Sequence, residues 1–249
     1  MRFFKLTLSY DGTAYAGWQV QSNADTVQAR LEHALHSVTG ESTRMTASGR
    51  TDAGVHALAQ VVSFSSTTAL ACDVLLRALN ANLPSDIRVL RVEEAREGFH
   101  AIRDAVRKRY RYVLNDAPIP DVFRRAYAWH VRQQLDVAAM QQAASALLGT
   151  HDFRSFEAAG SERATSVRTI TDVSVRREPG AEALVVVEVE ADGFLYNMVR
   201  NIVGALVEVG SGSRPANWIG DVIAALDRKA AGVTAPPQGL FLVKVDYDE

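Results

Sequence analysis

Hydrophobic and polar residues alternate in several short stretches of the chain, and a period of two predicts β-strands. Near the N-terminus, Phe4, Leu6 and Leu8 alternate with polar residues. The same pattern predicts further strands at 57–65, 87–92, 108–112, 168–177, 183–191 and 240–245. Elsewhere apolar residues recur every three or four positions, which predicts helices near 27–38, 74–79, 137–148, 199–207 and 218–226.

The order of these elements predicts the fold class. With the short helix near 218–226 left out, each half of the chain follows the order β-α-β-β-α-β, although no residue-level repeat relates the halves. This order is typical of ferredoxin-like or RRM-like units. We expect an α+β protein with one half at residues 1–100 and the other at 101–249. Their sheets are expected to join into one continuous, mostly antiparallel sheet with a central cleft.

Composition excludes several classes of protein. The chain has 249 residues, of which 47% are hydrophobic and 22% charged, as in a globular protein with a proper core. Its single cysteine, Cys72, allows no intrachain disulfide, which fits a reducing cytosol, and no Cys/His cluster indicates zinc. No apolar run is long enough for a signal peptide or a membrane span. The sequence therefore predicts a cytoplasmic protein with no membrane segment.

Charge is distributed unevenly along the chain. Residues 96–132 hold nine basic and four acidic side chains, a surplus of five, while the whole chain carries −2. Such a surplus favours a polyanionic partner met by one face. Within the strand at 108–112, Tyr110 and Tyr112 share one side, and Arg109 and Arg111 share the other. Tyrosines that stack on unpaired bases and arginines that hold phosphates suit RNA, whereas ordinary strand packing is the alternative for the tyrosines.

A loop rich in chemistry is expected at residues 48–56, Ser-Gly-Arg-Thr-Asp-Ala-Gly-Val-His. Gly49 and Gly54 allow backbone conformations or close approaches that other residues resist. Arg50 and Asp52 are two positions apart, so in an extended chain they project to the same side. A carboxylate beside a cation stays ionised and can act as nucleophile or base. The alternative is a structural Asp-x-Gly turn with Arg50 as a surface partner.

Arg200 stands near the start of a strongly amphipathic helix, where its charge opposes the helix dipole. It is therefore expected to have a carboxylate partner, with Asp52 as a candidate; a position on the solvent face is the alternative. Chemistry on a base inside a stem requires that the base be flipped out. Arg50, on a glycine-rich loop, could occupy the space that the base leaves.

Several motifs occur in order along the chain, the most specific being Gly-Arg-Thr-Asp-Ala-Gly-Val-His at 49–56. The others are Tyr10–Gly12, Gly17–Gln19, Val27–Gln28, Asn82–Pro84, Phe99–Ala101, Arg109–Tyr112, His151–Phe153 and Met198–Gly204. In this set the chain resembles the tRNA pseudouridine synthase A (TruA) family. The resemblance implies the pseudouridine synthase fold and the isomerisation of uridine to pseudouridine in the anticodon stem-loop of tRNA, at positions 38, 39 and 40. It also implies a homodimer that uses no cofactor and no metal.

The resemblance implies a role for each matching residue. Asp52 matches the catalytic aspartate, the nucleophile, and Arg200 the arginine that pairs with it. Tyr110 matches the tyrosine that packs on the target base and can serve as a general base, and Arg50 the arginine that helps to flip the nucleotide. Further substrate contacts are implied at Gln28, Arg109, Arg111 and Leu240.

One position departs from the family pattern, because Ile102 stands where an arginine usually follows Phe-His-Ala. This puts one backbone or RNA contact in doubt, but not the chemistry.

The physics of the reaction agrees with these roles. Breaking the glycosidic bond puts oxocarbenium-like charge on the ribose, which an ionised Asp52 can stabilise or trap. A covalent and a glycal route both remain open. A non-catalytic RNA-binding module of two RRM-like halves would leave Asp52 and Arg200 unexplained. A phosphotransferase with Asp52 as nucleophile would need Mg²⁺ and phosphate-cradling amides, and the sequence has no other acidic cluster near Asp52.

Overall fold

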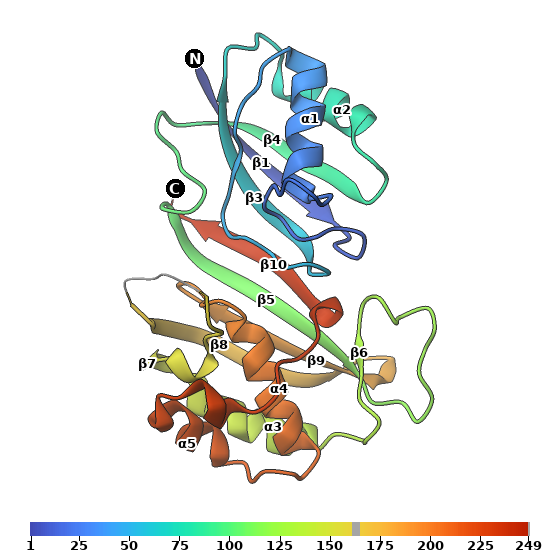
Figure 1. The fold of residues 1–249 in the computed structure, drawn as a ribbon, viewed down its shortest axis with the longest axis vertical. Coiled ribbons are helices and arrows are strands. Elements are labelled where there is room, and N and C mark those ends of the chain that lie inside the picture. The colour runs from blue at the N-terminus through green and yellow to red at the C-terminus, as the bar shows by residue number, and fades with distance from the viewer. Residues whose placement is uncertain (161–164, 249) are drawn as a thin grey trace. The chain divides into compact units, whose positions relative to one another are not determined.

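Residues 1–160 and 165–248 are described here from a computed structural model, in which the chain forms two compact units (Figure 1). The first unit comprises Met1–Val106 and Phe241–Glu249, and the second comprises Arg107–Leu240. Both combine helices with mostly antiparallel strands, so the α+β class is confirmed.

The first unit combines a sheet with two helices. Its elements are β1 (Arg2–Tyr10), α1 (Val27–Thr39), β2 (Thr46–Ala47), β3 (His56–Ser66), α2 (Cys72–Asn82), β4 (Ile87–Ala95) and β10 (Leu240–Tyr247). The strand order is β4-β1-β3-β10, and the short β2 pairs with β3. β1 is antiparallel to both β3 and β4. The helices α1 and α2 contact one another, and α2 packs against β4. Leu31 and Leu35 of α1 are fully buried, as the helical spacing predicts.

The last strand belongs to the first unit, although the sequence order places residues 101–249 together. β10 pairs with β3 in parallel, through Phe241 opposite His56 and Leu242 opposite Ala57. Parallel neighbours are not joined by a tight turn, so a strand from far along the chain can take this position. The periodicity of a strand shows which of its faces is buried, but not which other strand it pairs with. The chain passes from the first unit to the second between Val106 and Arg107, inside β5.

The second unit also combines a sheet with helices, and it has more helices than the first unit. Its elements are β5 (Ala105–Asn115), β6 (Trp129–His130), α3 (Val137–Ala144), β7 (Gly149–Asp152), β8 (Val167–Glu178), β9 (Ala181–Ala191), α4 (Met198–Gly210) and α5 (Trp218–Ala225). The strand order is β5-β9-β8-β7, antiparallel throughout, and β6 pairs in parallel with β5. The helix α3 packs against β8 and α4. Along α4, Ile202, Val203 and Leu206 are fully buried, which confirms the predicted apolar face.

Candidate functional site

The Asp52 loop, residues 48–56, lies between β2 and β3 of the first unit. Asp52 and Val55 form the ends of a β-turn, in which the Val55 N–H donates to the Asp52 carbonyl at 3.1 Å. Gly54 takes φ +76° at the third position of this turn, a conformation that favours glycine. The Asp-x-Gly turn, given above as the structural alternative, is therefore present. It leaves the Asp52 side chain half-buried and the Arg50 side chain exposed.

Neutral polar side chains on the buried side of the loop hold it in place. The hydroxyls of Tyr10 and Thr51 are 2.7 Å apart, and both residues are buried. Gln60 donates from Nε2 to the Gly49 carbonyl at 2.9 Å and accepts from the Ser48 hydroxyl at 2.6 Å. Burial raises the pKa of Tyr10 to about 12, so its hydroxyl stays protonated over the physiological range. The backbone on both sides of Arg50 is thus fixed by uncharged groups.

Two glycines of the preceding segment allow it to pack directly on the backbone of the loop. A Cβ on Gly12 would lie 2.0 Å from the Val55 carbonyl oxygen. Gly17 has φ +96°, and a Cβ there would lie 2.7 Å from the Thr51 carbonyl oxygen. The same oxygen accepts a 3.0 Å hydrogen bond from the Trp18 N–H. The two motifs at 10–12 and 17–19 therefore position the loop that carries Asp52.

Gln28 is also part of this support. It is buried, and its amide donates to Glu32 Oε1 at 2.8 Å and to the Met45 carbonyl at 3.0 Å. Its Oε1 accepts from the Val20 N–H at 3.1 Å. The side chain thus links the segment after Trp18 to the residues that precede the loop.

In the second unit, Tyr110 lies on the buried face of β5. It is 9% exposed, and its ring meets that of Phe194 edge-on, with centroids 5.0 Å apart and an interplanar angle of 84°. Tyr112 lies on the same face and donates from its hydroxyl to the Pro236 carbonyl at 2.7 Å. Burial raises the pKa of Tyr112. The predicted division of β5 into a tyrosine face and an arginine face is confirmed.

Arg200 is the third residue of α4 and is half-buried. Its Nε donates to the Ala235 carbonyl at 2.7 Å, and one terminal nitrogen donates to Asn197 Oδ1 at 2.9 Å. Asn197 precedes the helix with φ +58°, in the left-handed region. The guanidinium is thus oriented by groups on both sides, which goes against a fully solvated position.

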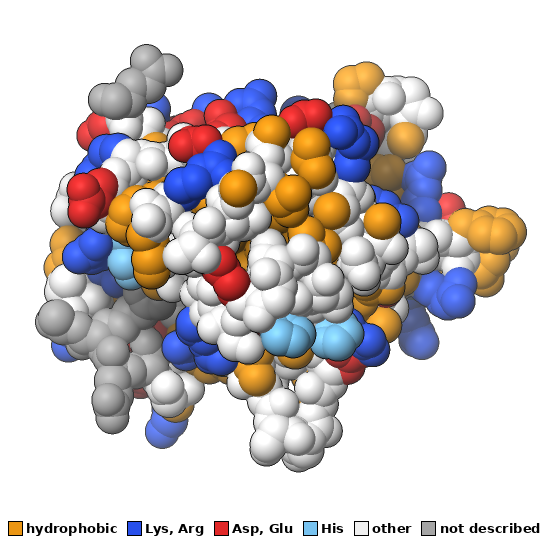
Figure 2. Space-filling view, turned by 90° about the horizontal axis from the view of Figure 1, so that it is seen from above, with side chains coloured by type: hydrophobic (Ala, Val, Ile, Leu, Met, Phe, Trp, Pro, Cys, Tyr) orange, Lys and Arg blue, Asp and Glu red, His pale blue; other side chains and the backbone are white. Residues whose placement is uncertain are grey.

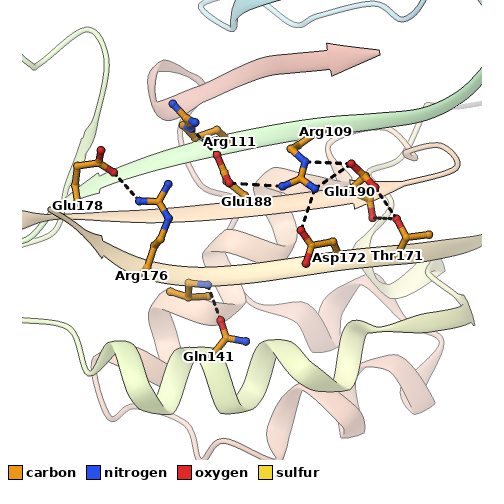
Figure 3. A network of polar contacts seen from close by, with 10 residues as sticks. Arg109, Arg111, Gln141, Thr171, Asp172, Arg176, Glu178, Glu188 and Glu190 are labelled. Carbon is orange, nitrogen blue, oxygen red and sulfur yellow. Dashed lines mark hydrogen bonds and ion pairs between the residues drawn. The ribbon is translucent and has the colours of Figure 1, made fainter. Parts of the chain in front are cut away.

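Arg109 and Arg111 have carboxylate partners on neighbouring strands. Figure 3 shows Arg109 directed towards Glu190, Glu188 and Asp172, and Arg111 towards Glu188. The basic surplus read from residues 96–132 is therefore partly balanced by acidic residues that lie far along the chain. On the face drawn in Figure 2, basic side chains are interspersed with acidic and apolar ones.

The structure thus groups some of the predicted site residues. Arg50, Asp52 and Gln28 lie in the first unit, and Tyr110 and Arg200 in the second. The pairing of Asp52 with Arg200 joins residues of different units and stays a prediction. Leu240 is 6% exposed and begins β10, and its contact with substrate stays a prediction too.

Sequence reasoning missed the supporting roles of Gln60, Phe194 and Asn197. Their only signal in the sequence is proximity to the motifs at 49–56 and 198–204, because each acts through a neighbour distant in the chain or through backbone conformation. Within 1–160 and 165–248, no group of three or more His, Cys, Asp or Glu side chains is arranged to hold a metal ion. In the same residues, no helix is both long and apolar enough to span a membrane.

Comparison with known proteins gives a consistent result. The family model described as tRNA pseudouridine synthase matches residues 7–102 and 143–248. The chain is 44% identical over 247 residues to tRNA pseudouridine synthase A of Thermoanaerobacter sp. (strain X514). The aligned residues make up 99% of this chain and 100% of the relative. The chain is 48% identical over 247 residues to the protein of that name from Acetivibrio thermocellus, with the same coverage. The one from Halalkalibacterium halodurans is 49% identical over 242 residues, covering 97% of this chain and 91% of the relative.

Proposed function

The chain belongs to the tRNA pseudouridine synthase family, enzymes that isomerise uridine to pseudouridine in tRNA, and we propose that it acts at positions 38, 39 and 40 of the anticodon stem-loop. The reaction breaks the bond between ribose C1′ and uracil N1 and forms one between C1′ and C5. As in glycoside cleavage, positive charge develops on the ribose while the first bond breaks. A fixed carboxylate next to C1′ is the group that this step needs.

We assign this role to Asp52. The observation that supports the assignment is its placement: a half-buried carboxylate on a loop that hydrogen bonds from Trp18, Tyr10 and Gln60 hold in place. A preorganised charge costs little rearrangement when the transition state forms. In a covalent route Asp52 attacks C1′, and in a glycal route it stabilises the charge; either route depends on the same carboxylate.

The other residues complete the proposed site. Arg200 pairs with Asp52 and keeps it ionised and oriented, which a guanidinium does well because it can make two parallel hydrogen bonds. Tyr110 packs against the freed uracil and is placed to take a proton. Arg50 is exposed at the edge of the loop and fills the space of the everted nucleotide. No cofactor takes part in this scheme.

The test of the proposed function is Asp52→Asn. Tritium release from tRNA that carries 5-tritiated uridine in its anticodon arm should be lost, while tRNA binding persists, because only the charge of the side chain changes. Release by the unaltered enzyme should be insensitive to EDTA. Asp25→Asn is the matched control, since Asp25 is an exposed aspartate of the same unit that pairs with Arg30. Normal turnover by the Asp52 variant would show that the assignment is wrong.

We also propose that the enzyme is a cytoplasmic homodimer. One surface supports a second copy: the loop between β5 and β6 exposes Ile119, Val122 and Phe123, which are 79%, 62% and 86% exposed. A cluster of large apolar side chains on a surface usually has a protein partner. The start of the loop between β5 and β6 is held by a hydrogen bond, in which the Ala117 N–H donates to Asn115 Oδ1 at 3.0 Å. Light scattering should find a dimer that Phe123→Ser weakens; a wild-type monomer would contradict this part.

A further inference from the structure

Two arginines flank Tyr110 on the opposite face of β5, and both are bound by carboxylates of β9. In the strand register, Arg109 lies opposite Glu190, and Arg111 lies opposite Glu188. Arg109 donates to Glu190 Oε2 from Nε at 3.1 Å and from a terminal nitrogen at 3.0 Å. Arg111 donates from Nε to Glu188 Oε1 at 2.8 Å. We call these four residues the β5–β9 ladder (Figure 3).

The β5–β9 ladder extends to the strand β8. Arg109 also connects the two ion pairs of the ladder, because it contacts the glutamate that binds Arg111. Arg109 contacts Asp172 of β8 at 3.0 Å and Glu188 at 3.7 Å. Thr171, also on β8, donates to Glu190 Oε1 at 3.1 Å. A network with shared, two-pronged contacts holds its geometry far better than isolated surface pairs, which contribute little.

Burial and charge argue against these arginines as phosphate ligands. The side chains of Glu188 and Glu190 are only 12% exposed, and that of Arg109 is 29% exposed. With Arg107, one terminal nitrogen of which lies 3.9 Å from Glu190 Oε1, three guanidiniums face three carboxylates in this cluster, so their charges balance. A phosphate would therefore meet little positive charge, and binding it would break ion pairs that are partly shielded from water.

The position of the ladder points to a different role. Tyr110 sits between the two arginines in sequence and faces Val189, which sits between the two glutamates. A residue in a strand is placed by its backbone, and here the backbone is tied to β9 directly before and after Tyr110. The tyrosine ring also meets Phe194 at 5.0 Å on the other face.

We propose that the β5–β9 ladder positions Tyr110 for the substrate base and that Arg109 and Arg111 do not bind tRNA phosphates. The inference rests on the proposed function, since it takes Tyr110 as the residue that meets the uracil. It replaces the expectation that both arginines contact substrate. Arg109, Arg111, Glu188 and Glu190 are thus positioning residues, which act through Tyr110.

The test uses the full-length enzyme and the double variant Glu188→Gln/Glu190→Gln, which keeps shape and removes charge. Single-turnover tritium release should fall about tenfold, because a small displacement of a positioned group is costly. The dissociation constant for tRNA, and its dependence on salt, should stay unchanged. If the arginines were phosphate ligands, the variant would bind tRNA more tightly and its salt slope would steepen by about 0.7 to 0.9 for each arginine released. That result, or an unchanged rate, would overturn the proposal.

Two further variants separate positioning from loss of fold. Arg176→Gln removes the 2.7 Å pair with Glu178, which lies on β8 away from Tyr110, and it should leave rate and binding unchanged. An equal fall in rate with this control would mean that the sheet merely needs its ion pairs. Arg109→Lys should lower the rate with tRNA binding unchanged, because lysine cannot reproduce the two-pronged contact with Glu190.

The link to Tyr110 is tested by a double-mutant cycle. In a Tyr110→Phe background the ladder variant should cost clearly less than tenfold, since residues that act as one unit are not additive. A full tenfold loss in both backgrounds would show that the ladder acts elsewhere. The cycle is independent of Asp52→Asn, so the ladder can fail while the proposed function holds.

Discussion

The Asp52 loop and the Tyr110 strand are held in place by different kinds of interaction. The loop is fixed by uncharged hydrogen bonds among Tyr10, Thr51 and Gln60 and by close backbone contacts at Gly12. The strand is fixed by ion pairs that start from Arg109 and Arg111. Neutral contacts respond little to salt and pH, whereas ion pairs respond to both. The loop of Asp52, the residue to which we assign the chemistry, therefore has the support that solution conditions disturb least.

The largest effect is expected from Gly12→Ala. Its methyl group would lie 2.0 Å from the Val55 carbonyl oxygen, so the Asp52 loop must move. Overpacking against backbone costs about 3 kcal/mol, measured as the free energy of unfolding in urea. Tritium release should be lost with it. Gly40→Ala is the control, because nothing lies within 4 Å of its Cβ and only the strain of φ +76° remains, about 1 kcal/mol. Equal effects of the two variants would disprove the close-contact argument.

A smaller effect is expected from Tyr10→Phe, which removes one hydroxyl beneath the loop. Thr51 loses its partner at 2.7 Å in a buried site, so the free energy of unfolding should fall by about 1 to 2 kcal/mol. Because Thr51 is adjacent to Asp52, the single-turnover rate should fall as well. Tyr112→Phe removes a similar bond, to the Pro236 carbonyl, and provides the matched comparison in the second unit. If Tyr10→Phe leaves both stability and rate unchanged, the neutral network is not what holds the loop.

The smallest effect is expected for the pH dependence of the free energy of unfolding, to which the ion pair of Asp152 with Arg154 contributes. The hydrogen-bonded pair with Arg154, followed by the Ser166 hydroxyl, lowers the pKa of Asp152 in β7 from 3.8 to about 2. A depressed carboxyl pKa stabilises the fold fully above about pH 4, and that contribution is lost as the pH falls towards 2. Asp152→Asn should therefore cost up to about 1 kcal/mol at pH 6, after allowance for solvent screening, and almost nothing near pH 2.

Tyr10→Phe is the control for this pH dependence. The Tyr10 hydroxyl has a pKa of about 12, so its contribution to the free energy of unfolding should be constant between pH 6 and pH 2. Both expectations are checked by denaturant unfolding of the unaltered protein and of the Asp152→Asn and Tyr10→Phe variants between pH 6 and pH 2. A constant effect of Asp152→Asn would show that the carboxyl is not paired in solution.

Much of the local structure could be predicted from the sequence, because local periodicity reports which face of an element is buried. The alternation at 108–112 correctly divides β5 into a tyrosine face and an arginine face. The glycines at 49–56 correctly indicate a loop, within which Gly54 takes the left-handed conformation of the alternative Asp-x-Gly turn. The strand β7 (Gly149–Asp152) is absent from the predicted strands, since four residues are too few to show a period.

Partnership between distant segments is what the sequence could not supply. Arg109 and Glu190 are 81 residues apart, and nothing in the basic run at 96–132 indicates that β9 would balance it. The same is true of Phe194 against Tyr110, which depends on how the chain enters α4. The role that we propose for Arg109 therefore depends on a pair that only the folded chain shows.

The sequence by itself determined the long strands and the helices, the loop that carries Asp52 and, through its motifs, the enzyme family. Only the tertiary structure decided that β10 completes the sheet of the first unit and that Arg109 and Arg111 face carboxylates. The physical reason is that propensity and periodicity act over a few residues. Strand pairing and ion pairing are instead settled by the packing of segments far apart in the chain.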